Sequence, residues 1–228
     1  IDIIYIENDD EAVAGVGDGV GVQTTAVVGS SVTNVEKLVV TDLAAENNLG
    51  DVTITLSSGM TQTAFEVDAS SLDANVTDLG QGERLTLTNS DNLKMTAHGG
   101  GYSDIITGGS GADIINGNGG NDTLLGAGGN DVINGGDGVD SITGGTGVDS
   151  ISAGAGNDII IVADDAEFKV SGGVETVDGG LGTDTLNFTE AADLTLTAPE
   201  LSKLYSIEKI VLGSNTTSLT FGNETFTN

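Results

Sequence analysis

Carboxylates recur at a fixed spacing along the middle of this chain. Between residues 99 and 161 the sequence divides without a gap into seven units of nine residues, such as GNGGNDTLL and GGDGVDSIT. An eighth unit, GGLGTDTLN, stands alone at residues 179–187. The sixth residue of every unit is aspartate, namely Asp104, Asp113, Asp122, Asp131, Asp140, Asp149, Asp158 and Asp184. One or two such aspartates would be ordinary turn residues, but seven in register indicate oxygen ligands for a metal ion.

Each unit predicts a tight turn followed by a strand of three residues. The first six residues are mostly turn-formers, with glycines free to adopt positive φ, and the eighth residue is always aliphatic. A strand this short is not stable alone. We therefore expect the units to stack as a right-handed coil of parallel strands, with two units in each turn. The aspartates then form two columns: Asp104, Asp122, Asp140 and Asp158 on one side, and Asp113, Asp131 and Asp149 on the other.

The two columns need a cation between their carboxylates. Successive turns of such a coil lie about 4.8 Å apart, a spacing at which stacked carboxylates repel one another. Calcium takes about six to eight oxygen ligands at ~2.3–2.6 Å, so it fits between two aspartates and the carbonyls of the glycine-rich turns. The sequence therefore predicts Ca2+ bound between turns on both sides of the coil.

The nine-residue units resemble the G-G-x-G-x-D-x-U-x repeat of the RTX (repeats-in-toxin) family. The resemblance covers residues 99–161 and the unit at 179–187. It implies an all-β fold, a right-handed parallel β-roll or β-solenoid with calcium-binding turns. Tyr102 departs from the pattern because it replaces a glycine, so the first turn is expected to bind calcium poorly or to act as a cap. Asn118, Ala127 and Ala153 also replace glycines.

The flanking sequences predict further rungs of the solenoid without calcium. Residues 51–98 contain Thr-rich runs that alternate apolar and polar residues, such as VTITL and LTLT, which is typical of half-buried strands. Residues 162–228 contain similar runs, and a short helix is expected around residues 199–204. The predicted organisation is thus a strand-rich segment (1–98), the calcium roll (99–161) and a β-rich continuation (162–228).

The beginning of the chain resembles the end of the roll. Residues 2–6 (DIIYI) match residues 158–162 (DIIIV), and residues 34–40 match residues 206–212. Residues 1–40 therefore look like the exit from an earlier β-roll, with Asp2 at its metal-binding position, and the chain is expected to be part of a larger modular protein. The acidic stretches at 8–11 and 164–167 are expected to be solvated turns, with an extra calcium ion as the alternative.

Composition excludes several classes of function. Thirty-five acidic residues against six basic ones give a formal charge of −29. This argues against nucleic acid, whose phosphates need Lys and Arg, and against anionic membranes. No apolar run approaches the ~18 residues of a membrane span. The chain has no cysteine, and His98, its only histidine, has no nucleophile motif beside it. We expect His98 to be structural and the chain not to be an enzyme.

Three functions remain open on the sequence. The RTX-like repeats, the scarce Lys and Arg, and the modular repetition resemble bacterial surface-layer proteins and large adhesins. This implies an extracellular structural module at the cell surface that folds when it binds calcium, with copies of itself or other surface components as further partners. The alternative is a C-terminal accessory domain of a type I-secreted protease, lipase or epimerase. A third function is ice or carbohydrate binding by a flat Thr-bearing face. Ice binding would favour a regular column of threonines, whereas the ninth residues of the units are irregular.

Overall fold

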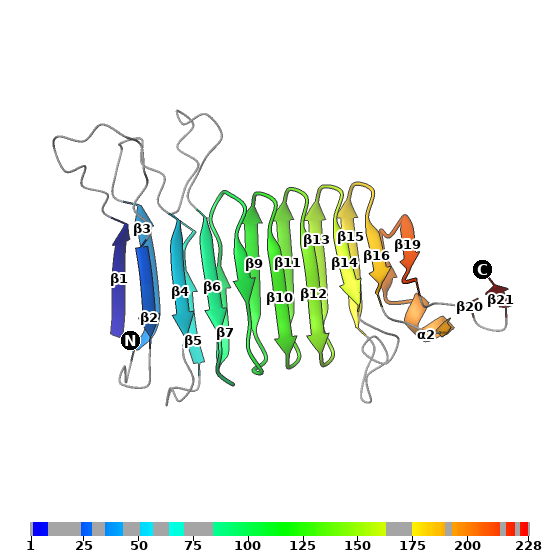
Figure 1. Cartoon of the computed structure of the whole chain (residues 1–228), viewed down its shortest axis with the longest axis horizontal. Helices are drawn as coiled ribbons and strands as arrows, with labels where there is room; N and C mark the ends of the chain where they lie inside the picture. Colours follow the sequence, from blue (N-terminus) through cyan, green and yellow to red (C-terminus); the bar gives the residue numbers. More distant parts are fainter. Residues whose placement is uncertain are drawn as a thin grey trace.

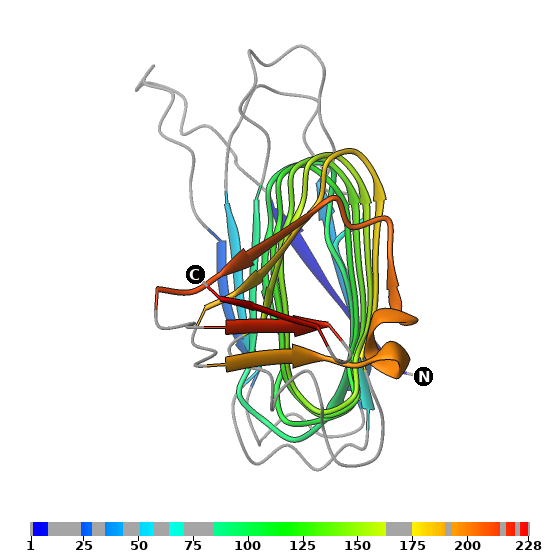
Figure 2. The same ribbon diagram turned by 90° about the vertical axis from the view of Figure 1, so that its right-hand side faces the viewer.

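The computed structural model consists almost entirely of parallel strands arranged in two facing sheets. The structure describes residues 2–8, 24–28, 35–42, 51–56, 64–70, 84–162, 175–189, 193–214, 218–221 and 224–227. From β1 to β16 the chain alternates between the two sheets, so each turn of the coil adds one strand to each sheet (Figure 1). Figure 2, which looks along the coil, shows the turns lying over one another. This is the predicted parallel β-roll.

The strands of each sheet follow one another in space. The first sheet contains β1 (Asp2–Asn8), β3 (Val35–Asp42), β5 (Ala64–Asp68), β7 (Lys94–His98), β9 (Ile114–Gly119), β11 (Val132–Asp137), β13 (Ser150–Ala155), β15 (Thr176–Leu181) and β18 (Leu204–Tyr205). The second contains β2 (Thr24–Val28), β4 (Val52–Leu56), β6 (Leu85–Asn89), β8 (Ile105–Thr107), β10 (Thr123–Gly128), β12 (Ser141–Thr146), β14 (Ile159–Val162), β16 (Thr185–Phe188) and β19 (Lys209–Leu212). A third sheet contains β17 (Asp193–Leu196), β20 (Ser218–Phe221) and β21 (Glu224–Thr227).

The register of the repeat is 18 residues, as predicted. Leu124 lies opposite Ile106 and Ile142 in one sheet, and Ile133 lies opposite Ile115 in the other. The core is a thin double stack of the eighth residues of the units, each no more than 3% exposed: Ile106, Ile115, Leu124, Ile133, Ile142, Ile151 and Ile160.

Most strands of the repeat are longer than predicted. The sequence predicts strands of three residues, which holds for β8, but β9 to β13 have six residues each. Each of these strands continues into the first residues of the next unit. Ala127 pairs with Gly145 and Gly128 with Thr146. The turn-forming residues thus also contribute backbone hydrogen-bonding groups to the ladder, so turn and strand overlap in sequence.

Rungs outside the repeat belong to the same two sheets. β6 pairs with β8, and β7 pairs with β9, so the strands of residues 51–98 run directly into the repeat. They bury more apolar surface than the repeat does: Val52, Ile54 and Leu56 on β4 are all fully buried. The two sheets continue across residues 98 and 161, so no break in strand pairing marks a segment boundary at either position. The predicted boundaries stay a prediction.

Residues beyond 161 add further rungs to the roll. The unit at 179–187 stands alone in the sequence, but in the structure Leu186 lies opposite Ile160 as the next rung. The expected helix is α2 (Ala198–Leu201), whose first turn is closed by a hydrogen bond from the Thr197 amide to the Glu200 carboxylate. It ends before residue 204 because β18 pairs there with β15.

Candidate metal sites

Each predicted aspartate of the repeat lies in the turn that leads into a strand. Figure 2 shows these turns stacked at the two narrow ends of the roll's cross-section. All eight carboxylates are buried, with residue exposures of 0–2%: Asp104, Asp113, Asp122, Asp131, Asp140, Asp149, Asp158 and Asp184. Burial of so many acidic side chains is unusual, because carboxylates are almost never fully buried unless they are paired.

Backbone hydrogen bonds connect the aspartates into the two predicted columns. Oδ1 of Asp122 accepts from the amide of Asp104 at 2.7 Å, and the amide of Asp122 donates in turn to Oδ1 of Asp140 at 2.8 Å. The same bonds join Asp140 to Asp158 and Asp158 to Asp184. The second column is built alike: Asp113 donates to Asp131, and Asp131 donates to Asp149.

The second oxygen of most of these carboxylates has no protein partner. Oδ2 is buried without a hydrogen-bond donor in Asp122, Asp131, Asp140, Asp149, Asp158 and Asp184. In the first two units the same atom is satisfied: Gly100 N donates to Asp104 Oδ2 at 2.7 Å, and Gly109 N to Asp113 Oδ2 at 2.8 Å. A buried polar atom left without a partner costs about 1–3 kcal/mol, and more when it is charged. Six such atoms therefore require another binding partner.

At four of the six unpaired oxygens a carbonyl oxygen approaches the same small space, namely those of Asp122, Asp131, Asp140 and Asp184. A Cβ added to Gly117 would lie 2.2 Å from Asp122 Oδ2 and 2.5 Å from the carbonyl oxygen of Gly135 in the next turn. At Gly126 the corresponding distances to Asp131 Oδ2 and Gly144 O are 2.3 and 2.5 Å. Carboxylate and carbonyl oxygens are the ligands that calcium prefers, so the donor set fits the predicted ion.

Burial raises the pKa of the seven aspartates from Asp104 to Asp158. Loss of hydration raises the pKa of Asp122 and of Asp131 to about 7, well above the value of an exposed carboxyl. Neighbouring carboxylates in the column raise it further, while the backbone donors oppose the shift. The pKa of Asp104 and of Asp140 is raised to about 6. A divalent cation would supply the opposite charge that favours the ionised forms.

The repeat matches a known family of calcium-binding sequences. The family model for the RTX calcium-binding nonapeptide repeat (4 copies) matches residues 98–133 and 134–165. Residues 98–165 are RTX repeats. RTX nonapeptide repeats bind calcium ions, and the proteins that contain them are generally secreted. None of the curated proteins and none of the solved structures matches the chain.

The RTX columns end in apolar residues at the N-terminal side. Leu85 and Met95 occupy the aspartate position of the preceding turn, and their amides donate to Asp104 Oδ1 at 2.8 Å and to Asp113 Oδ1 at 2.6 Å. The first RTX turns thus stack on rungs that offer no carboxylate at the aspartate position. The satisfied Oδ2 atoms of Asp104 and Asp113 also distinguish these first two units from the later ones. That the first turn binds calcium poorly or acts as a cap stays a prediction.

At the C-terminal side the columns continue in glutamates that the sequence did not reveal. Thr176 lies opposite Ser150, which places Glu175 at the position of Asp149, and Glu175 is 2% exposed. Glu208 accepts the amide of Asp184 at Oε2. The signal for Glu175 was the sequence GGVET at 172–176, which keeps two glycines of the repeat but has glutamate for aspartate.

The metal-binding role of Asp2 and the roles of the two acidic stretches stay predictions. Asp2 begins β1, whose neighbour is β3, with Ile3 opposite Lys37. The side chain of Asp2 and, apart from Asn8 at the end of β1, the stretches at 8–11 and 164–167 lie outside the described residues.

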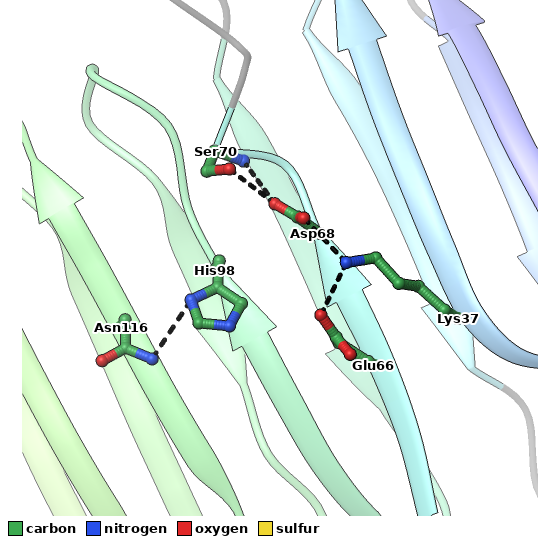
Figure 3. Close-up of polar contacts among 6 residues, drawn as sticks. All are labelled: Lys37, Glu66, Asp68, Ser70, His98 and Asn116. Carbon is green, nitrogen blue, oxygen red and sulfur yellow. Dashed lines mark hydrogen bonds and ion pairs between the residues drawn. The ribbon is translucent and has the colours of Figure 1, made fainter. Parts of the chain in front are cut away.

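A few polar side chains outside the columns form contacts between neighbouring strands. On the outer face of the first sheet, the amide of Asn116 donates to Nδ1 of His98 at 3.3 Å (Figure 3). Nearby, Lys37 forms ion pairs with Glu66 and Asp68. Within the described residues there is no group of three or more His, Cys, Asp or Glu side chains that could hold a metal. The candidate sites of the columns therefore depend on backbone carbonyls as much as on carboxylates.

Proposed function

We propose that this chain is a calcium-dependent structural module of a secreted bacterial surface protein, which folds when it meets calcium outside the cell. Its ligands are the column aspartates, from Asp104 to Asp158 and Asp184, together with carbonyls of the turns. The observation that carries the proposal is the set of six buried carboxylate oxygens without a partner. RTX repeats are structural and not catalytic by themselves, and we propose no enzymatic activity for the rest of the chain.

Energetics support folding that depends on calcium. Each unit buries one aliphatic side chain at its eighth position, which stabilises the fold by about 1.5–3 kcal/mol. The backbone entropy lost on ordering the nine residues of a unit opposes this small apolar contribution. At ~1 mM calcium, sites with Kd of about 10⁻⁴–10⁻³ M each add about 0.4–1.4 kcal/mol. Six coupled sites supply about 2–8 kcal/mol, a large part of the stability of a typical domain.

Calcium titration of the full chain tests the proposal. The chain is first equilibrated with chelator and then titrated with calcium, and folding is followed by circular dichroism and binding by calorimetry. We expect β signal and calcium binding to rise together in a steep transition. Complete β signal in chelator, or no binding at millimolar calcium, would contradict the proposal.

Asp131→Asn is the matched test of the ligands. Asp131 accepts from the turn before it and donates to the turn after it, so its loss affects two neighbouring sites. We expect a several-fold higher calcium concentration at the midpoint. Asp137→Asn is the control, because it removes the same charge from an exposed side chain nearby. Equal midpoints for the two variants would show that the column carboxylates are not the ligands.

Placement at the cell surface rests on the resemblance to surface-layer proteins and adhesins. No helix in the described part of the chain is long and apolar enough to cross a membrane. The alternative is an accessory domain of a type I-secreted enzyme. The two functions predict different further domains in the polypeptide to which this chain belongs. Further modules like this one would support the surface protein, and a hydrolase or epimerase domain would support the alternative.

A further inference from the structure

One aspartate column extends beyond the RTX match to the C-terminal end of the roll. Ile210 lies opposite Leu186, and Lys209 opposite Thr185, so Glu208 stands to β19 as Asp184 stands to β16. The hydrogen bond that joins the two residues also has the same form as those inside the column. Oε2 of Glu208 accepts from the amide of Asp184 at 2.8 Å, as Oδ1 of Asp140 accepts from the amide of Asp122.

Asp184 supplies an independent sign of a ligand at this position. The residue is 0% exposed, and its Oδ2 is buried without a hydrogen-bond partner. A Cβ added to Gly179 would lie 2.7 Å from this Oδ2 and 2.2 Å from the carbonyl oxygen of Ser206. The Ser206 carbonyl therefore takes the place that Gly135 O has beside Asp122. Ser206 has a φ of 51°, so the chain adopts a left-handed conformation there without glycine.

We propose that Asp184, the carbonyl of Ser206 and Glu208 bind a calcium ion that fastens β18 and β19 to the end of the roll. The proposal rests on the proposed function, since it extends the same chemistry past residue 165 to residues with a different sequence pattern. Glutamate is a common calcium ligand, and turn carbonyls and water complete the oxygen shell.

The last rungs need such a tie because their apolar contacts are weaker than those inside the roll. Leu186 and Phe188 on β16 are fully buried, whereas Ile210 and Leu212 on β19 are only partly buried against the core. β18 has two residues, and one of them, Tyr205, is 49% exposed. An ion between Asp184 and Glu208 would hold the turn that connects β18 to β19, and with it both strands.

Glu208→Gln in the full chain tests this site. The amide oxygen of glutamine can still accept the Asp184 amide, so the variant removes charge with little change in shape. We expect calorimetry to find one calcium ion fewer than in the parent chain. We also expect amide hydrogen exchange of residues 204–212 in calcium to become about tenfold faster, with β10 to β13 unchanged. Asp137→Asn, which removes an exposed charge, should behave as the parent in both measurements.

The outcomes separate this site from the proposed function. If the parent chain binds no calcium, the proposed function fails and this inference fails with it. If the parent binds calcium but Glu208→Gln keeps both the full number of ions and the protection of residues 204–212, only the site at Asp184 and Glu208 is overturned. Asp184→Asn is the second variant and should lose the same ion.

Discussion

Glycine begins six of the seven consecutive repeat units, and the position has a steric explanation. In these units a Cβ would enter the space shared by the aspartate's Oδ2 and, in most of them, a carbonyl of the next turn. The second position is restricted by backbone instead, because Gly136 and Gly145 have positive φ there and a Cβ would lie 1.9 and 2.2 Å from a carbonyl oxygen of the preceding turn. Asn118 and Ala127 occupy this second position with φ of 74° and 77°, and Asn118 offsets part of the strain by donating to the carbonyl of Gly99 at 2.7 Å. Glycine at the first position therefore leaves space beside the carboxylate, and the residue at the second position provides the backbone conformation of the turn.

Gly126→Ala should weaken calcium binding. Its Cβ would lie 2.3 Å from Asp131 Oδ2 and 2.5 Å from Gly144 O, so it would occupy the proposed site and force the turn to shift. Overpacking of this kind costs about 1–3 kcal/mol. Calorimetry should show a lower affinity and a calcium midpoint several-fold higher. Gly119→Ala is the control, because its nearest contact would be an ordinary 3.8 Å. The steric explanation fails if both variants bind calcium equally.

The sequence predicts ligand positions where the period is kept and misses them where it changes. The seven aspartates of the repeat could be assigned to two columns because each unit has nine residues. Glu175 and Glu208 could not, because the residue type changes and the turns lengthen. The amide of Asp158 reaches a carboxylate 26 residues ahead, and that of Asp184 one 24 residues ahead. Which Oδ2 atoms are unpaired depends on the direction of single backbone amides, which the residue types do not determine.

Outside the repeat, one lysine joins two neighbouring strands through ion pairs. On β3 and β5, Lys37 donates to Glu66 at 2.8 Å and to Asp68 at 2.9 Å, and Ser70 also donates to Asp68 (Figure 3). Burial alone would raise the pKa of Asp68, but the hydrogen bonds from Ser70 and Lys37 outweigh it and lower the pKa to about 2. A lowered pKa stabilises the fold above the pKa of the unfolded chain, and this contribution is lost as the pH falls through about 2.

Lys37→Met should raise the pKa of Asp68 toward its value of ~4 in an unfolded chain. The shift is expected to be partial, because the Ser70 donors remain. Carbon-13 NMR of the Asp68 carboxyl measures it directly. Above pH 4 the variant should lose about 0.5–1 kcal/mol of stability, the range for partly exposed ion pairs, and the loss should shrink at lower pH. Lys94→Met on β7 is the control, since Lys94 forms no ion pair among the described residues. An unchanged Asp68 titration in Lys37→Met would contradict this role.

Stability is distributed unevenly along the whole molecule. Strands such as β4 bury three apolar side chains, including Ile54 and Leu56, whereas strands of the repeat bury about one aliphatic side chain each. In a solenoid each rung contacts only its neighbours, so stability is roughly the sum of rung and interface terms. The rungs before the repeat should therefore stand without calcium, and they present amides of Leu85 and Met95 to the first aspartates. We therefore expect these rungs to act as a template on which the calcium-binding turns fold in order.

Hydrogen exchange in chelator should reveal this difference. We expect amides of β4, β6 and β7 to remain protected while those of β10 to β13 exchange freely, and we expect calcium to restore protection first in β8 to β10. Mass spectrometry of peptides from the full chain resolves these segments. Equal protection of all strands in chelator would show that the repeat does not depend on calcium more than the other rungs do.

Leu87→Ala tests whether the template controls the calcium turns. Leu87 is fully buried and lies between Ile54 and Ile106, at the junction of the apolar rungs and the repeat. Its truncation costs about 2–5 kcal/mol. If the repeat folds onto this rung, part of that loss must appear as a higher calcium concentration for protection of β10 to β13, although no ligand has changed. Val132→Ala, at a side chain 50% exposed within the repeat, should leave that concentration near the parent value. If Leu87→Ala weakens only β4 to β6 and leaves the calcium dependence of β10 to β13 unchanged, the repeat folds independently of its flank.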